Sequence, residues 1–154
     1  MNYEYEATIR WTGNQGSGTS AYDAYSRDHV IEIDGKPPIA ASADPAFRGD
    51  PARHNPEELL LASLSSCHML WYLHLAAVNK IVVTAYTDRA QGFMEMPKGG
   101  TGHFTRAILR PEVTISSGDA ALAARLHKTA SEHCFIANSV NFPVEHTPRI
   151  INGF

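Results

Sequence analysis

A long apolar stretch, residues 55–79, constrains the fold of this chain more than any other feature. It opens with signals of a helix N-terminus: Asn55 can cap, Pro56 suits the first helical position, and two carboxylates follow at the positive end of the helix dipole. A helix that is apolar on nearly every side is normally covered by other elements. Polar residues interrupt the run and argue against a membrane span: Ser63, Ser65, Ser66, Cys67, His68 and His74. We therefore predict a buried central helix.

The composition predicts one globular domain over residues 1–154. Hydrophobic residues make up 44% of the chain and charged residues 19%, which is ordinary for a soluble protein. The net charge of -3 provides no basic excess, so we expect no nucleic-acid partner. No signal peptide or polybasic tract is evident, and we expect a cytoplasmic protein without membrane association. In a reducing cytoplasm the two cysteines, Cys67 and Cys134, are better suited to redox chemistry or metal binding than to a permanent disulfide.

The residues before the central helix alternate between polar and apolar types, which is typical of strands. The alternation predicts strands over residues 3–12 and 26–34 and a short strand at 39–41. Residues 42–54 contain several Pro, Gly and Asp residues and predict an irregular loop leading into the helix. A loop of that length in a compact domain is often functional.

The residues after the central helix predict a hairpin, a second helix and a closing strand. Gly92 marks a bulge, and Ser117 is placed to cap the second helix, whose apolar stripe ends at Cys134. The predicted elements are a strand over 81–96, a tip at 97–102, a strand over 103–116, a helix over 119–134, a helical turn at 136–140 and a strand over 143–151. The order of elements is that of an α+β fold.

Cys67 lies three turns into the central helix, where a thiol is poorly placed to react. The thiolate is the reactive form, but an apolar surrounding raises a thiol pKa, and the helix dipole acts only within the first turn. Activation therefore requires a cation from outside the helix, and arginine suits a partly buried site because it stays charged there. Arg27, Arg48 and Arg53 all precede the helix in segments that could reach back to it.

A carboxylate could fix the plane of such a guanidinium group by a bidentate contact. Glu57 is the free candidate, because Glu58 is better placed to complete a capping box with Asn55. Glu57 and Cys67 are ten residues apart, which is about 15 Å along a continuous helix. Either an arginine bridges that gap, or a second subunit supplies the Glu–Arg pair. We favour the second subunit, since a helix this apolar could also bury itself in a homodimer interface.

Three simpler readings of the cysteines stay open at this point. Each thiol could be an inert core residue, and His68 a hydrogen-bonded structural histidine. The pairs Cys67–His68 and His133–Cys134 could form a zinc site, but adjacent helical residues point about 100° apart and rarely reach one ion, so we expect no metal. A Cys–His hydrolase lacks a clear orienting partner for its histidine.

Two patterns, NPEELLLASLSSCHM at residues 55–69 and HCFIANS at 133–139, together resemble the OsmC/Ohr family of thiol-dependent hydroperoxide reductases. The resemblance covers most of the chain and includes the order of strands, helix, hairpin, helix and strand. It implies antiparallel sheets packed around a long central helix, in an intertwined homodimer with active sites at the subunit interface.

The resemblance also implies roles for particular residues. Cys67 matches the peroxidatic cysteine, Cys134 the resolving cysteine, and Glu57 the glutamate that orients the catalytic arginine. The two positions that hold this arginine in known branches are occupied here by Asn14-Gln15 and by Ala46. We therefore place Arg27 first, with Arg48 and Arg53 as alternatives. His68 stands where better-known branches have an aromatic residue and is expected to adjust thiol acidity or substrate preference.

The implied activity is reduction of organic hydroperoxides without a cofactor. Cys67 would form a sulfenic acid, Cys134 would convert it to a disulfide, and an external dithiol, a lipoylated protein in some relatives, would reduce the disulfide. Phe47 and Phe135 are the expected apolar residues of the substrate pocket. The alternative is a stress-associated or small-ligand-binding dimer with weak or no peroxidase activity, which would fit the missing family arginine.

Overall fold

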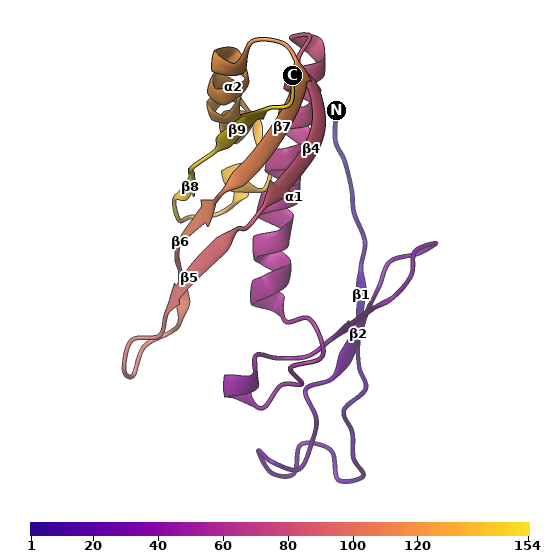
Figure 1. The fold of residues 1–154 in the computed structure, drawn as a ribbon. Coiled ribbons are helices and arrows are strands. Elements are labelled where there is room, and N and C mark those ends of the chain that lie inside the picture. Colours follow the sequence, from indigo (N-terminus) through magenta and orange to yellow (C-terminus); the bar gives the residue numbers. More distant parts are fainter. The chain divides into compact units, whose positions relative to one another are not determined.

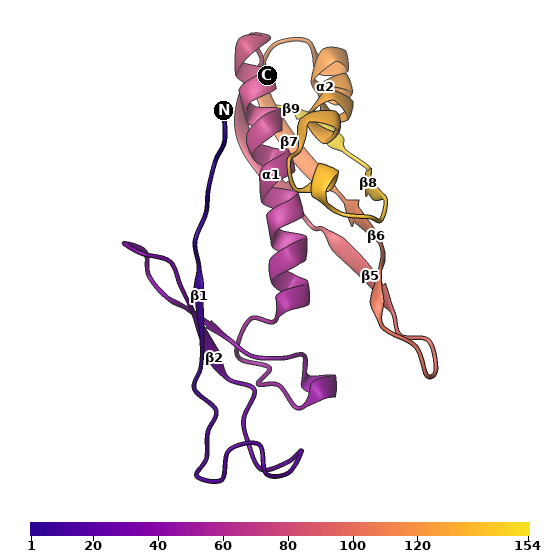
Figure 2. The same ribbon diagram turned by 180° about the vertical axis from the view of Figure 1, so that it is seen from behind.

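The computed structural model describes residues 1–154 and divides them into two compact units, Met1–Leu60 and Leu61–Phe154. Figures 1 and 2 show the elements of each unit from two sides. The helices and strands together form a mixed α+β protein, which confirms the predicted class.

The first unit contains a three-stranded antiparallel sheet in the order β1-β2-β3. Its strands are β1 (Thr8–Trp11), β2 (His29–Glu32) and β3 (Ile39–Ala41). The prediction for residues 39–41 is confirmed, but those for 3–12 and 26–34 were too long. β1 pairs only from Thr8↔Glu32 to Trp11↔His29, so the alternating residues outside that register have no strand to pair with.

The loop before the central helix is irregular, as predicted, and its own side chains brace it. Asp44 accepts a hydrogen bond from the backbone N–H of Ala46 at 2.7 Å and caps a short 3-10 helix, η1 (Pro45–Phe47). The Ser42 hydroxyl accepts a hydrogen bond from the Asp50 N–H at 3.0 Å. These local turns give hydrogen-bond partners to backbone N–H groups that lie outside the sheet.

The central helix is α1 (Pro56–Val78), and its N-terminus has the predicted signals. The Asn55 side chain accepts a hydrogen bond from the Glu58 N–H at 2.9 Å, and its amide donates to the Glu58 carboxylate at 3.2 Å. In a standard capping box the Glu58 carboxylate would accept from the Asn55 backbone N–H, whereas here it accepts from the Asn55 side-chain amide.

Within one chain, α1 buries a single stripe of side chains, Leu64, His68, Tyr72 and Ala76. Other apolar residues stay exposed, among them Leu70 at 62% and Val78 at 60%. The helix is long and apolar enough to cross a membrane by those two criteria alone, a test that core helices of soluble proteins also pass. We predicted a buried central helix, but a single chain buries only one side of α1.

The second unit contains two three-stranded sheets, β4-β7-β9 and β5-β6-β8. Each strand of the predicted hairpin breaks in two, because the hairpin passes from one sheet to the other. The Asp88 carboxylate stabilises the chain at the point where the strands break, because it accepts a hydrogen bond from the Arg110 N–H at 2.6 Å. The strands are β4 (Val82–Asp88), β5 (Gln91–Glu95), β6 (His103–Leu109), β7 (Pro111–Ser117), β8 (Val144–His146) and β9 (Arg149–Asn152).

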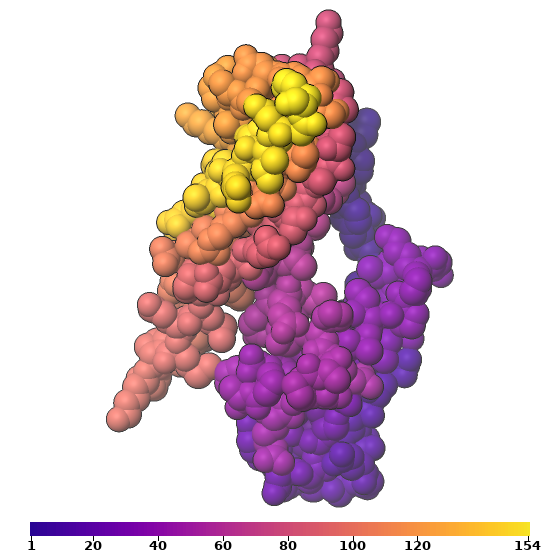
Figure 3. Space-filling model, viewed as in Figure 1, coloured from indigo at the N-terminus to yellow at the C-terminus, as the bar shows by residue number.

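The expectation of purely antiparallel sheets is wrong for the last two strands. β8 pairs with β6 and β9 pairs with β7, both in parallel. The chain reaches them from β7 through α2 (Ala120–His133) and η2 (Ala137–Ser139), and a helical crossover of this kind is what parallel pairing requires. In Figure 3 the yellow C-terminal segment lies on the orange surface of this region.

The hydrophobic core of the second unit lies between α1, α2 and the β4-β7-β9 sheet. Figures 1 and 2 both show α2 beside the C-terminal half of α1, with the sheet covering one side. The buried residues of this core are Tyr72, Ala76, Ile81, Val113, Ile115, Ala123, Leu126 and Ala130. Asp119, not the predicted Ser117, caps α2 by accepting a hydrogen bond from the Leu122 N–H at 3.0 Å.

Candidate functional site

The two cysteines, 67 positions apart in the sequence, come together in the second unit. Cys67 is partly exposed on α1, and Cys134 is buried at the C-cap of α2. Burial, and to a lesser extent the interaction with Cys67, raises the pKa of the Cys134 thiol to about 11. The Ala137 N–H donates to the Cys134 sulfur at 3.4 Å and acts in the opposite direction. The packing of α1 on α2 thus places two free thiols close enough to interact.

An aromatic surface lies beside this pair, formed by Trp71 of α1 and the residues flanking Cys134. The Trp71 ring contacts Phe135 edge-on at 5.5 Å between centroids and His133 at 5.1 Å. Phe135 is 68% exposed. Leu70, Trp71 and His74 line a shallow cavity of about 260 Å³. Of the two predicted pocket residues, Phe135 therefore lies in an open apolar surface next to the buried thiol.

Three histidines, His68, His127 and His146, cluster in the second unit. His68 Nε2 and His127 Nδ1 are 3.0 Å apart, and the His146 ring lies 5.8 Å from the His68 ring between centroids. Burial lowers the pKa of His68 to about 4 and that of His127 to about 3, and it also lowers the pKa of His146. Asp88 acts in the opposite direction on the pKa of His68.

Sequence reasoning singled out His68 from this cluster and missed its two partners. His127 lies three residues before Ala130 and seven before Cys134, so its place on the inner face of α2 could have been recognised from the helical period. His146 carries no such signal, because it follows from the parallel pairing of β8. No group of three or more His, Cys, Asp or Glu residues in the structure is arranged to hold a metal ion.

The first unit brings together Arg27, Phe47 and Glu57, which line one cavity of about 350 Å³. Glu57 Oε2 is buried there and accepts no hydrogen bond. The Arg27 guanidinium donates to the backbone oxygens of Tyr22 and Tyr25, both at 2.7 Å, and lies 4.6 and 4.0 Å from the centroids of their rings. An orphaned carboxylate oxygen and an arginine therefore share a cavity without pairing.

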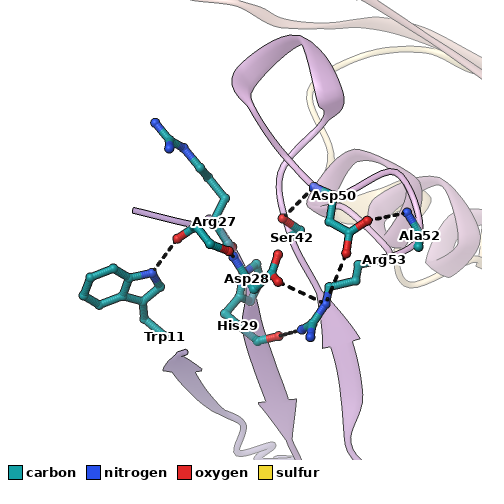
Figure 4. A network of polar contacts seen from close by, with 9 residues as sticks. Trp11, Arg27, Asp28, His29, Ser42, Asp50, Ala52 and Arg53 are labelled. Carbon is teal, nitrogen blue, oxygen red and sulfur yellow. Dashed lines mark hydrogen bonds and ion pairs between the residues drawn. The ribbon is translucent and has the colours of Figure 1, made fainter. Parts of the chain in front are cut away.

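The two alternative arginines are placed differently. Arg53 forms ion pairs with Asp28 at 3.4 Å and Asp50 at 3.7 Å, and it donates to the His29 backbone oxygen at 3.4 Å. Figure 4 shows this network, with the Arg27 side chain pointing away from it. Arg48 ends η1 in a left-handed conformation, 6.0 Å from the Tyr22 ring. Neither residue lines the cavity that contains Glu57.

Comparisons with known proteins agree on one family. A family model described as OsmC-like protein matches residues 49–149. An OsmC-like protein of unknown function from Vibrio cholerae is 36% identical, with a TM-score of 0.85, covering 97% of this chain and 100% of that one. No curated protein matches the chain.

More distant structures share the fold. An organic hydroperoxide resistance protein OsmC from Legionella pneumophila is 19% identical, with a TM-score of 0.65 and 96% of each chain covered. An organic hydroperoxide resistance protein from Elizabethkingia anophelis is 17% identical, with a TM-score of 0.68 and 99% of each chain covered.

Proposed function

Because this chain belongs to the OsmC-like protein family, we propose that it is a peroxidase that uses Cys67 and Cys134 to reduce organic hydroperoxides to alcohols. The observation that supports the proposal is the interaction between the two free thiols, which the packing of α1 on α2 brings together. A partly exposed cysteine beside a buried one is the arrangement in which the first can meet a peroxide and the second can capture the product. Solved structures with this fold include organic hydroperoxide resistance proteins.

The proposed reaction has two steps at sulfur. The Cys67 thiolate attacks the distal peroxide oxygen, the O–O bond breaks, and the departing alkoxide takes a proton to become the alcohol. Cys67 is then a sulfenic acid. The Cys134 sulfur attacks the Cys67 sulfur, the S–O bond breaks, and hydroxide leaves as water with the Cys134 proton. An external dithiol returns the disulfide to two thiols by exchange.

In this proposal Arg27 supplies the positive charge and Glu57 holds its plane. The buried Glu57 Oε2 has no partner, and a bidentate guanidinium contact would satisfy it. Arg27 would exchange the carbonyls of Tyr22 and Tyr25 for that contact and stabilise the charge that develops on the peroxide oxygen.

The proposed active form is a homodimer. The helix α1 is continuous from Pro56 to Val78, so Glu57 and Cys67 are about 15 Å apart along its axis. A second copy could supply the Glu57–Arg27 pair across an interface and cover the exposed apolar side chains of α1, such as Leu70. The proposed apolar pocket residues are Phe47, which lines the cavity that contains Glu57, and the exposed Phe135, and they would favour organic over inorganic peroxides.

One observation favours a second candidate, a stress-associated or ligand-binding dimer without peroxidase activity. The Arg27 guanidinium already has two carbonyl partners and two aromatic neighbours within its own unit. If those contacts persist when a peroxide is present, no cation activates Cys67, and the fold would keep only a binding role.

A thiol titration separates these candidates. Free thiols are counted before and after one equivalent of cumene hydroperoxide, in the parent and in a Cys134→Ser variant. A peroxidase loses both thiols in the parent, and the variant keeps a sulfenic acid that dimedone traps. Two unreacted thiols in the parent would refute peroxidase activity and leave the binding protein.

A further inference from the structure

The buried histidine pair links the two helices that carry the cysteines. His68 directly follows Cys67 on α1, and His127 lies seven residues, or two turns, before Cys134 on the inner face of α2. Both histidines are almost fully buried, at 1% and 0% exposure. The His68 Nε2 and His127 Nδ1 atoms are 3.0 Å apart, so a hydrogen bond joins the two helices.

The contacts between α1 and α2 follow one another in order along both helices. The Tyr72 hydroxyl donates to the Ala123 backbone oxygen at 3.0 Å, His68 is hydrogen-bonded to His127, and the free Cys67 thiol interacts with the free Cys134 thiol. Moving from Tyr72 toward Cys67 on α1 corresponds to moving from Ala123 toward Cys134 on α2. The histidine contact is therefore the polar link next to the thiols, and it lies one residue from Cys67.

We propose that the His68–His127 hydrogen bond is a positioning element that holds Cys67 within bonding reach of Cys134. A hydrogen bond is short and directional, whereas the hydrophobic effect is non-directional, so the bond fixes the relative position of two groups more narrowly. A polar pair in an otherwise apolar contact can fix the register of two helices. The consequence for the rate of disulfide formation rests on the proposed peroxidase function, but the effect on the separation of the thiols does not.

The protonation state of the pair follows from its surroundings. Burial lowers the pKa of both imidazoles, and His146 lowers them further, so both rings are neutral near pH 7 and one must donate to the other. His127 Nε2 is buried and has no hydrogen-bond partner. Burying an unpaired lone pair at His127 Nε2 costs less free energy than burying an unpaired N–H. His127 is therefore protonated on Nδ1, which donates to His68 Nε2.

This assignment defines the variants that test the proposal. In His127→Asn the amide nitrogen takes the place of Nδ1 and can still donate, whereas His127→Leu removes the donor. On the other helix, His68→Gln keeps an acceptor near the position of Nε2, and His68→Leu removes it. Leu126→Ala is the matched control, because it weakens the same core from the neighbouring position on α2 without touching the histidine bond.

The first measurement is the equilibrium between the Cys67–Cys134 pair and glutathione in redox buffers, which requires no peroxidase activity. The effective concentration of the two thiols should fall roughly tenfold to hundredfold in both Leu variants and stay near the parent value in His127→Asn, His68→Gln and Leu126→Ala. Unchanged values in both Leu variants, or an equal fall in Leu126→Ala, would overturn the proposal.

The second measurement separates this proposal from the proposed function. After one equivalent of cumene hydroperoxide, rapid-quench mass spectrometry follows the sulfenic acid and the disulfide as separate species. His127→Leu should form the sulfenic acid at the parent rate and convert it to disulfide roughly tenfold or more slowly. If the parent forms no sulfenic acid, peroxidase activity is refuted, and the glutathione equilibrium still decides whether the histidines position the thiols.

Discussion

Tyr72 lies flat against His127, with 3.9 Å between ring centroids and 13° between ring planes. The Tyr72 hydroxyl donates to the backbone oxygen of Ala123, one turn earlier on α2. One side chain of α1 therefore covers a buried imidazole and also pairs with the helix that carries it.

We predict that Tyr72→Phe keeps the ring contact and loses only the hydrogen bond, lowering the free energy of unfolding by about 1 kcal/mol. Tyr72→Ala should cost about 3–5 kcal/mol, because the buried ring is lost as well. Tyr86→Phe is the control: the Tyr86 hydroxyl is buried without a partner, so its removal should be neutral or stabilising. Urea unfolding measures all three, and equal losses for the two Phe variants would contradict the assignment.

The histidine cluster should make the protein acid-sensitive well above the range where carboxylates titrate. In the unfolded chain imidazoles gain protons near pH 6.5, whereas the folded-state pKa is about 4 for His68 and about 3 for His127. Between these values the unfolded state binds more protons, so stability falls as the pH drops from about 6.5 to 4, by a few kcal/mol in total.

Urea unfolding at a series of pH values measures this slope. The double variant His68→Leu, His127→Leu should show a much flatter dependence between pH 6.5 and 4. Leu126→Ala removes no titratable group, so it should lower stability without changing this slope. A parent protein equally stable at both ends of this range would rule out neutral burial of the pair.

The two thiols should differ in their reactivity toward alkylating reagents. Cys67 is partly exposed, whereas Cys134 is 1% exposed and burial raises the pKa of its thiol to about 11. Iodoacetamide at pH 8 should therefore modify Cys67 first and Cys134 only slowly, because the thiolate is the form that reacts. Peptide mass spectrometry measures each rate, and in urea the difference should disappear. Similar rates in the native protein would show that Cys134 is accessible.

The arginine that supports catalysis can be identified by three matched substitutions. Arg27→Lys should lower kcat/KM for cumene hydroperoxide by about 10²-fold, because lysine cannot form a bidentate contact with Glu57. Arg48→Lys and Arg53→Lys should leave kcat/KM near the parent value, since neither residue lines the cavity that contains Glu57. A larger loss in either of these two variants would transfer the role to that residue.

Local sequence signals determined the helix ends and much of the secondary structure. Asn55, Pro56 and Glu58 predicted the start of α1, and the interaction that sets such a boundary spans only a few residues. The same signals failed at α2, where Ser117 and Asp119 both qualify as caps. The structure selects Asp119, because Ser117 is the last residue of β7 and pairs with Val82.

The sequence by itself also determined the family, because the spacing of NPEE, Cys67 and the later Cys134 is a pattern within one chain. Only the tertiary structure decided which side chains meet. His68, His127 and His146 come from α1, α2 and β8, and the contact between the two thiols follows from the packing of α1 on α2. Periodicity shows which face of a helix is apolar, but the partner of that face depends on long-range packing, which no local pattern encodes.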